Sequence, residues 1–446
     1  MKKIIVLFFA LLFCFIGYSQ TIINRVSNVY DMVLAVNSDS LQSYVEHLVT
    51  FNSRHSHSSL LVEDNEVGAS QEWLSNKFKS YIPHSGGRLS VSTDSYVLPP
   101  SQRFPVQHTY NNVVATIKGT DVNDTRIFLV MAHLDSRAGN GNEPHAYSPG
   151  ANDDGSGIAA LIELCRILSA KPFSATIMLA GVSGEEVGLL GAGAMAERAK
   201  KEEWNISAVL NNDMIGQSHG NGIDIIDNTR MRVFSRSTPR DETPEERAYR
   251  MYNSMENDGK PRQLARYIKT VGETYVDNLE VVLIYREDRF GRGGDQTPFL
   301  NQGFTAVRLM EMNENFDRQH KDISDDISQY GDVPQAMDFE YLRKTTAVNL
   351  SVVASLASAP SEPQNARVRI NNQDNRSLLS WNAPLHGKTA GYYVLVRETS
   401  ASQWQKKYYT TATEFVLPYT RDNYFFGVQA VGADGTESMI TFVTAR

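Results

Sequence analysis

The chain has almost no cysteine, with only Cys14 and Cys165 among its 446 residues. Cys14 lies inside the N-terminal segment "MKKIIVLFFALLFCFIGYSQ". A mature chain without that segment would keep one cysteine and could form no internal disulfide. This excludes a small secreted module held together by disulfides, so the stability of the fold must come mainly from its core.

The sequence also lacks a block of basic residues, an internal repeat and a long low-complexity segment. Acidic residues outnumber basic ones by 51 to 43, which gives a formal net charge of -8. This balance argues against a nucleic-acid partner. Hydrophobic residues make up 41% of the chain and charged residues 21%, as in an average soluble protein. The length of 446 residues predicts two domains.

The first twenty residues combine two lysines, one apolar run and a small, polar end. This layout predicts a secretory signal peptide at residues 1–20, cleaved near Ser19 or Gln20. The alternative is an uncleaved membrane anchor, which the apolar run disfavours because it is short for a bilayer span. We therefore expect cleavage and no stable membrane span in the mature chain. Phe13 precedes Cys14, whereas a lipoprotein signal has a small residue before its cysteine, so no lipoprotein anchor is expected. The sequence therefore predicts export to the periplasm or the extracellular space.

Residues 21–357 predict an α/β domain with a mixed, largely parallel sheet flanked by helices, because short β-rich apolar runs alternate with longer helical patterns. A helix is expected at "GIAALIELCRILSA", which is apolar on more than one face. The central strands are expected at "RIFLVMAHL", "ATIMLAGV", "AVLNNDMIG", "VVLIYRE" and "TAVRLMEM".

The C-terminal part of the chain has a different composition. Residues 358–364 predict a linker rich in Ala, Ser and Pro. Residues 365–446 contain short alternating strands separated by turn residues, which predicts a small all-β sandwich. Its expected core includes Trp381 on an early strand, and Tyr424, Phe426, Val428 and Ala430 in alternation on a late one. Through these residues the tail resembles a fibronectin type III domain.

Polar side chains follow several of the expected strands. In "VMAHLDSRAG", His133 and Asp135 are two residues apart at the end of an apolar run, so both leave the strand on one face. Open α/β sheets bind ligands at the carboxyl ends of their strands. The carboxylate of Asp135 is positioned to hold and orient the imidazole of His133. By itself, such a pair is more typical of an ordinary surface His and Asp.

Further candidate metal ligands lie in four other segments, most of them just after an expected strand. Each alone is typical of a turn, a helix cap or a solvated acid. Together, imidazoles and carboxylates with no thiolate predict zinc or a similar divalent ion at one edge of the sheet, and more than four candidate ligands favour two ions. The candidates are Asp153 and Asp154 in "SPGANDDGSG", Glu185 and Glu186 in "GVSGEEVG", Asp213 in "LNNDMIG" and His320 in "NFDRQHKD".

This ordered set, over roughly residues 40 to 355, resembles the M28 family of co-catalytic zinc aminopeptidases of the leucyl or bacterial type. The resemblance implies a zinc exopeptidase-like fold and two zinc ions per chain. Asp153 would bridge the ions, one also held by His133 and Asp213 and the other by Glu186 and His320. A fibronectin type III-like tail is a common accessory of such exported enzymes.

The resemblance also implies hydrolysis of peptides with a free N-terminus by a hydroxide bound between the ions. Glu185 would be the general base, and Asp135 would orient His133. The family often has Tyr before the late His, where this chain has Gln319, an amide donor that could contact the oxyanion or the substrate. "GGDQ" at residues 293–296 also departs from the family's pattern at the pocket wall.

Three other functions stay open at this point. A glutaminyl cyclase shares the fold and keeps one zinc at the positions of Asp153, Glu186 and His320, but the presence of His133 and Asp213 favours two ions. A carboxypeptidase on the same scaffold would release C-terminal residues. A catalytically dead surface protein that binds partners through its tail would have lost ligands, and none is lost here.

Overall fold

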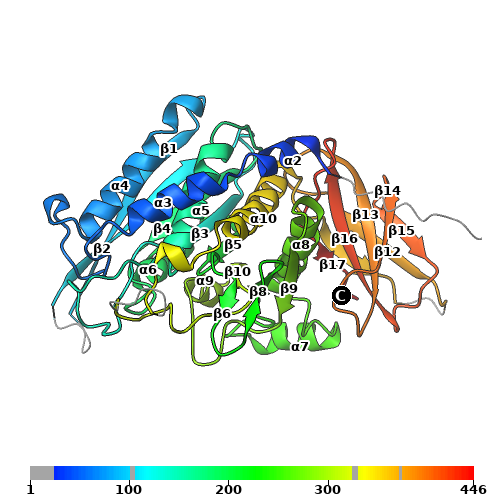
Figure 1. Ribbon diagram of the computed structural model, residues 1–446. Coiled ribbons are helices and arrows are strands. Elements are labelled where there is room, and N and C mark those ends of the chain that lie inside the picture. Colours follow the sequence, from blue (N-terminus) through cyan, green and yellow to red (C-terminus); the bar gives the residue numbers. More distant parts are fainter. Residues whose placement is uncertain (1–24, 101–105, 324–329, 371–373, 446) are drawn as a thin grey trace, which may run out of the picture.

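The computed structural model of the chain describes residues 25–100, 106–323, 330–370 and 374–445. The predicted signal peptide, which contains Cys14, lies outside these residues and stays a prediction. None of the helices in the described residues combines the length and apolarity needed to cross a membrane. An α/β part and a smaller all-β part lie side by side (Figure 1).

An eight-stranded mixed sheet forms the centre of the α/β part, in the order β1-β2-β4-β3-β5-β10-β8-β9. Its strands are β1 (Leu89–Leu98), β2 (His108–Ile117), β3 (Ile127–His133), β4 (Thr176–Val182), β5 (Ile206–Asn212), β8 (Arg230–Phe234), β9 (Glu280–Ile284) and β10 (Ala306–Glu311). The four central strands, β4, β3, β5 and β10, run parallel. The prediction of a mixed, largely parallel sheet is confirmed, with all five expected strands present as β3, β4, β5, β9 and β10.

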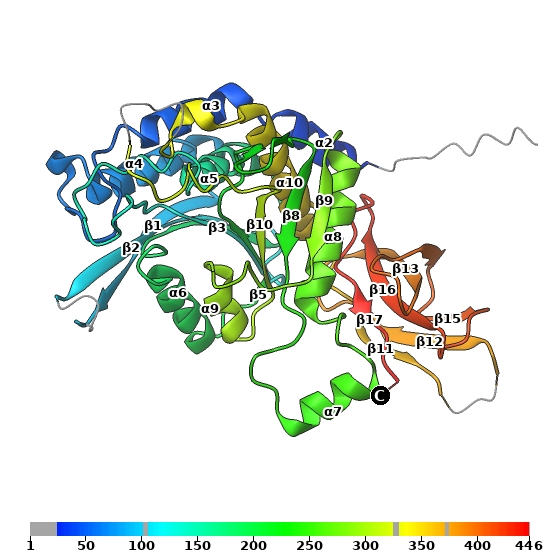
Figure 2. The ribbon, with the colours of Figure 1, turned by 60° about the horizontal axis from the view of Figure 1, so that its bottom comes forward.

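Helices cover both faces of this sheet (Figure 2). The helices of the α/β part are α2 (Ser27–Leu34), α3 (Ser38–Leu48), α4 (Val67–Lys79), α5 (Gly155–Leu168), α6 (Leu190–Lys201), α8 (Lys260–Tyr275), α9 (Gln296–Asn301) and α10 (Phe339–Ser358), together with α7 (Pro244–Tyr252), which buries no residue and lies away from the sheet. The helices α4, α5, α8 and α10 share one apolar core with the sheet, while α6 and α9 pack on its opposite face. A small two-stranded ribbon of β6 (His219–Gly220) and β7 (Ile225–Ile226) lies outside the main sheet.

Two helices are apolar on nearly every side because they lie between the sheet and other helices. In α5 every residue except Arg166 is buried, as its sequence predicts. Asp154 caps the start of α5 by accepting a hydrogen bond from the Gly157 amide at 3.0 Å. Asp338 caps α10 in the same way through the Tyr341 amide. Both caps fix where these helices begin relative to the sheet edge.

The C-terminal residues form two antiparallel sheets, β11-β12-β15 and β14-β13-β16-β17, that face each other across a separate apolar core (Figure 1). In that core Trp381 is 4% exposed and meets the ring of Tyr392 edge-on. α10 ends at Ser358 and the next strand begins at Gln364, which brackets the predicted linker. The strands are β11 (Gln364–Val368), β12 (Ser377–Asn382), β13 (Thr389–Glu398), β14 (Lys406–Thr410), β15 (Glu414–Leu417), β16 (Tyr424–Gly432) and β17 (Thr441–Phe442).

A buried ion-pair network joins the two parts. Asp258, in the loop before α8, lies 3.0 Å from Nη1 of Arg266 on α8 and 2.5 Å from Nη2 of Arg397 on β13. All three side chains are at most 2% exposed. Met439 of the tail also belongs to the apolar core of the α/β part. The tail is therefore packed against α8 rather than loosely tethered.

Candidate metal centre

The structure brings the predicted ligands together at one edge of the sheet. His133 ends β3, while Glu186 follows β4 and Asp213 follows β5, so their side chains meet where these parallel strands end. Asp153 arrives on the loop before α5, and His320 on the segment after β10. They form two groups of potential ligand atoms, each within 4.8 Å of one another: His133, Asp153 and Asp213, and Asp153, Glu186 and His320.

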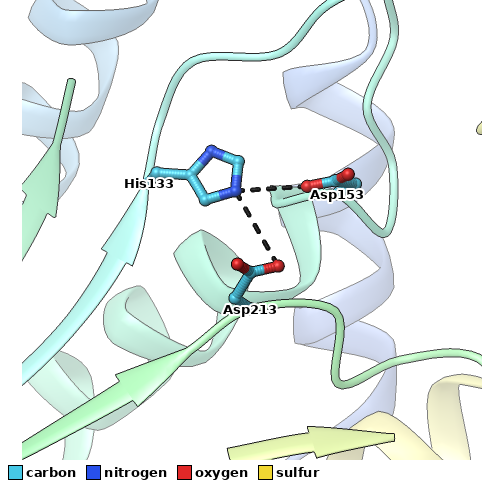
Figure 3. Close-up of side chains that lie close together, drawn as sticks. All are labelled: His133, Asp153 and Asp213. Atoms are coloured by element: carbon cyan, nitrogen blue, oxygen red, sulfur yellow. Dashed lines mark ion pairs between the residues drawn. The ribbon is translucent and has the colours of Figure 1, made fainter. Parts of the chain in front are cut away.

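In the first group, Nε2 of His133 points at two carboxylates, 3.1 Å from Oδ1 of Asp153 and 3.9 Å from Oδ1 of Asp213 (Figure 3). Nδ1 lies 2.9 Å from the main-chain carbonyl of Asp135, which can only accept, so Nδ1 carries the proton. In a neutral ring Nε2 then presents a lone pair to two anions. That buried atom has no hydrogen-bond partner among the described residues, which fits a nitrogen that binds a metal ion.

Asp135 orients His133 differently from the prediction. The sequence predicts that its carboxylate holds the ring, but Oδ1 is 3.7 Å from Nδ1 and the carbonyl oxygen makes the close contact instead. The carboxylate accepts hydrogen bonds from the main-chain amides of Gly184, Glu185 and Glu186 at 3.0 to 3.2 Å. Asp135 therefore positions both the imidazole and the loop that carries the two glutamates.

In the second group, Nε2 of His320 lies 3.0 Å from Oδ2 of Asp153 and 2.8 Å from Oε1 of Glu186. Asp153 thus gives one carboxylate oxygen to each group, which is the arrangement that the sequence resemblance implies for a bridging ligand. The side chain of Glu186 is only 4% exposed. Buried carboxylates this close together require a compensating cation.

The pKa values of side chains in and beside these two ligand groups are shifted in the direction that adds positive charge to the site. Burial alone would lower the pKa of His320, but Asp153 and Glu186 raise it to about 10. Burial, Asp213 and Glu186 raise the pKa of Glu185 well above its usual range. Without a metal, protons would supply the missing charge. Because ligands must lose their protons, metal binding at this site is expected to release them.

One arginine that the sequence analysis did not single out supports the first group. Arg308 on β10 is fully buried, with Nη2 2.9 Å from Oδ2 of Asp213 and Nη1 3.1 Å from Oδ2 of Asp288. Burial by itself would raise the pKa of Asp213, but Arg308 and His133 lower it below its usual value. A charged residue inside the apolar run "TAVRLMEM" was the available signal, because a buried charge needs a partner.

We expect Arg308→Gln to reduce the free energy of unfolding by about 2 kcal/mol in the presence of a chelator, because Asp288 loses a charged hydrogen-bond donor and Asp213 loses its ion-pair partner. Added zinc should recover part of this loss, since a cation beside Asp213 replaces the missing charge. Denaturant unfolding with and without zinc measures both effects. An equal loss of unfolding free energy with and without zinc would show that Arg308 does not stabilise the first ligand group.

Other residues support the loop of Asp153. The carboxylate of Asp332 accepts hydrogen bonds from the main-chain amides of Asp153 at 2.7 Å and Asn152 at 2.8 Å. Burial raises the pKa of Asp332 to about 7. No spacing in the sequence singles out Asp332. Gln319, the predicted oxyanion or substrate contact, is buried and donates from Nε2 to Oδ2 of Asp153 at 3.2 Å. The structure thus places its amide beside the potential ligands.

A cavity of about 480 Å³ opens onto these groups. The loop between β9 and α9 forms one wall, including Gly293 of the "GGDQ" segment. Next to it, Asp295 is buried without a hydrogen-bond partner among the described residues, and burial raises its pKa to about 7. The cavity is lined by Arg137, Asp153, Glu185, Glu186, Gly188, Leu189, Asp213, Arg289, Gly291, Arg292, Gly293, Gln319 and His320.

Comparison with known proteins agrees with this arrangement. Residues 112–353, which include β3 and all the potential ligands, match peptidase family M28. The chain belongs to peptidase family M28. Over 409 residues it is 37% identical to a protein of Leptosphaeria maculans described as a "probable zinc metalloprotease", covering 91% of this chain and 94% of that one. This coverage extends beyond residue 363, so the similarity includes part of the all-β tail.

Solved structures show the same fold. The Legionella pneumophila LapA aminopeptidase superimposes with a TM-score of 0.54 at 19% identity, covering 77% of this chain and 78% of that one. A glutaminyl cyclase of Fimbriiglobus ruber gives a TM-score of 0.50 at 15% identity, with coverage of 72% and 95%. At these identities the likeness concerns the fold alone, so the chemistry must be argued from the residues of this chain.

Proposed function

We propose that this M28 peptidase is an exported zinc aminopeptidase that removes N-terminal residues from peptides. The observation that carries the proposal is Asp153, which gives one carboxylate oxygen to each of two ligand groups. The name of the Leptosphaeria maculans relative supports zinc, and the presence of His133 and Asp213 beside Asp153 favours a two-ion aminopeptidase over a one-zinc glutaminyl cyclase. Export rests on the N-terminal segment at residues 1–20.

We assign two zinc ions to each chain, one in each group. His and carboxylate ligands without thiolates suit zinc in catalytic sites. Asp153, Asp213 and Glu186 would supply three negative charges against four positive ones, and the imidazoles of His133 and His320 would bind as neutral ligands. When bound, zinc would lower the pKa of a water molecule and polarise the scissile carbonyl.

Glu185 is the proposed general base. It lines the cavity next to Glu186, and Asp135 holds the main-chain amides of both. Both glutamates lie in a turn in which the Glu185 carbonyl accepts hydrogen bonds from the amides of Gly188 and Leu189. Only the carboxylate of Glu186 belongs to a ligand group, so that of Glu185 is left to face the substrate space. Glu185 would take a proton from water and deliver it to the leaving amine. The amide of Gln319, which donates to Asp153 in the structure, would contact the oxyanion or the substrate.

The test compares one peptide with a free N-terminus and the same peptide N-acetylated, using purified mature chain. We expect hydrolysis of the free peptide alone, its loss in a chelator and its recovery with zinc. Mass spectrometry of the products identifies the residue released. Equal cleavage of the blocked peptide, release of C-terminal residues, or cyclisation of an N-terminal Gln without hydrolysis would each overturn the proposal.

A further inference from the structure

Three arginines line the same cavity as the potential metal ligands. Arg137 follows β3 closely, while Arg289 and Arg292 lie on the loop between β9 and α9. Arg137 is partly buried and Arg292 is exposed. This charge is not required by the chemistry of peptide-bond hydrolysis, so it raises the question of which anion these side chains face.

Among the described residues, carboxylates of the chain hold Arg289 alone of the three. Nη1 of Arg289 lies 2.7 Å from Glu314, and its Nε lies 3.1 Å from Asp288. Within the part of the chain that the structure describes, neither Arg137 nor Arg292 forms an ion pair. With the described residues, the side chain of Arg137 forms a single, long hydrogen bond, 3.5 Å from Nε to the carbonyl oxygen of Ala138.

The two arginines are also not counterions of the potential metal ligands. The guanidinium that pairs with Asp213 is that of Arg308, which comes from inside the sheet. The other two ligand carboxylates, Asp153 and Glu186, pair with His320. Once two divalent ions offset these carboxylates, the cavity wall formed by Arg137 and Arg292 carries uncompensated positive charge.

We propose that this cavity selects peptides that carry a carboxylate close to the scissile bond, an inference that rests on the proposed peptidase function. A guanidinium binds a carboxylate through two parallel N–H donors, and this pairing is strongest where water is partly excluded. The carboxylate has three possible sources: the side chain of an acidic first residue, that of an acidic second residue, or the C-terminus of a dipeptide.

Matched substrates distinguish these sources. Glu-Ala-amide is compared with Gln-Ala-amide, Ala-Glu-amide with Ala-Gln-amide, and Ala-Ala with Ala-Ala-amide, by kcat/KM on the zinc-loaded full mature chain. Each pair differs by one carboxylate at nearly constant shape. We expect at least one pair to favour the carboxylate by about ten-fold, the effect of one charge-assisted hydrogen bond. The favoured pair identifies the source.

Variants test whether the arginines are responsible. In Arg137→Gln, Arg292→Gln or the double variant, the preference should fall about ten-fold towards one, and more for the carboxylate substrate than for its amide partner. Arg286→Gln is the matched control. Arg286 is exposed on the same loop, does not line the cavity and stacks on Phe290, so its loss changes net charge equally without touching the cavity.

The outcomes separate this inference from the proposed function. Hydrolysis of the neutral amides with every carboxylate-to-amide ratio close to one overturns the preference and leaves the peptidase function standing. A preference that survives in the double variant, or that falls equally in Arg286→Gln, overturns the role of Arg137 and Arg292. Hydrolysis of none of the peptides overturns the proposed function and this inference with it.

Discussion

Glu185→Gln is expected to lower kcat by a factor of about 10²–10⁴, the contribution typical of a positioned general base. Glutamine keeps the shape of the side chain but cannot accept the proton from water. Glu185 belongs to neither ligand group, so zinc content should stay at the native value. Steady-state kinetics and elemental analysis of the same preparation measure both quantities.

The neighbouring residue provides the contrast. Glu186→Gln removes an anionic oxygen that lies 2.8 Å from Nε2 of His320. This variant should lose zinc from the second group, and high zinc concentrations should restore part of its activity. If Glu185→Gln also loses zinc, or keeps native kcat, the assignment of base and ligand within "GEE" is wrong.

Asp258→Asn is expected to reduce the free energy of unfolding by about 3–5 kcal/mol, because it leaves Arg266 and Arg397 buried without their shared counterion. Both arginines contact Asp258 directly, and their side chains are only 1% and 2% exposed. Nε2 of Gln263 also donates to this carboxylate at 2.9 Å. Asparagine would replace one of the carboxylate oxygens that accept these hydrogen bonds with an amide donor. Chemical denaturation of the zinc-loaded protein measures the loss.

Asp277→Asn is the matched control for this prediction. Asp277 also pairs with an arginine, but its side chain is 75% exposed, so the change should cost less than about 1 kcal/mol. Equal small losses in both variants would contradict a structural role of the tail. A large loss at Asp258 alone would show that the buried network joining α8 to the tail stabilises the folded chain.

The sequence predicts the two groups of potential metal ligands because each ligand can be recognised from the short segment around it. Each of His133, Glu186 and Asp213 directly follows an apolar run, and parallel strands must end at a common edge. The same reasoning identifies α5, whose buried character is visible in its composition. These features depend on short segments and on a general rule of α/β sheets, so neither needs knowledge of distant contacts.

The supporting residues depend on contacts between distant parts of the chain. Arg308 reaches Asp213 across 95 residues of sequence, and Asp258 reaches Arg397 across 139, so no spacing indicates either pair. The carbonyl of Asp135 replaces its carboxylate beside His133 because the carboxylate is already occupied by the amides of the glutamate loop. Competition between acceptors of this kind is decided by three-dimensional packing.

We infer that Asp153 joins two zinc sites, and anomalous diffraction above the zinc absorption edge would locate both ions. Crystals of the native mature chain should show two peaks. One should lie among His133, Asp153 and Asp213, and the other among Asp153, Glu186 and His320. A single peak, or two peaks that do not both contact Asp153, would contradict the account.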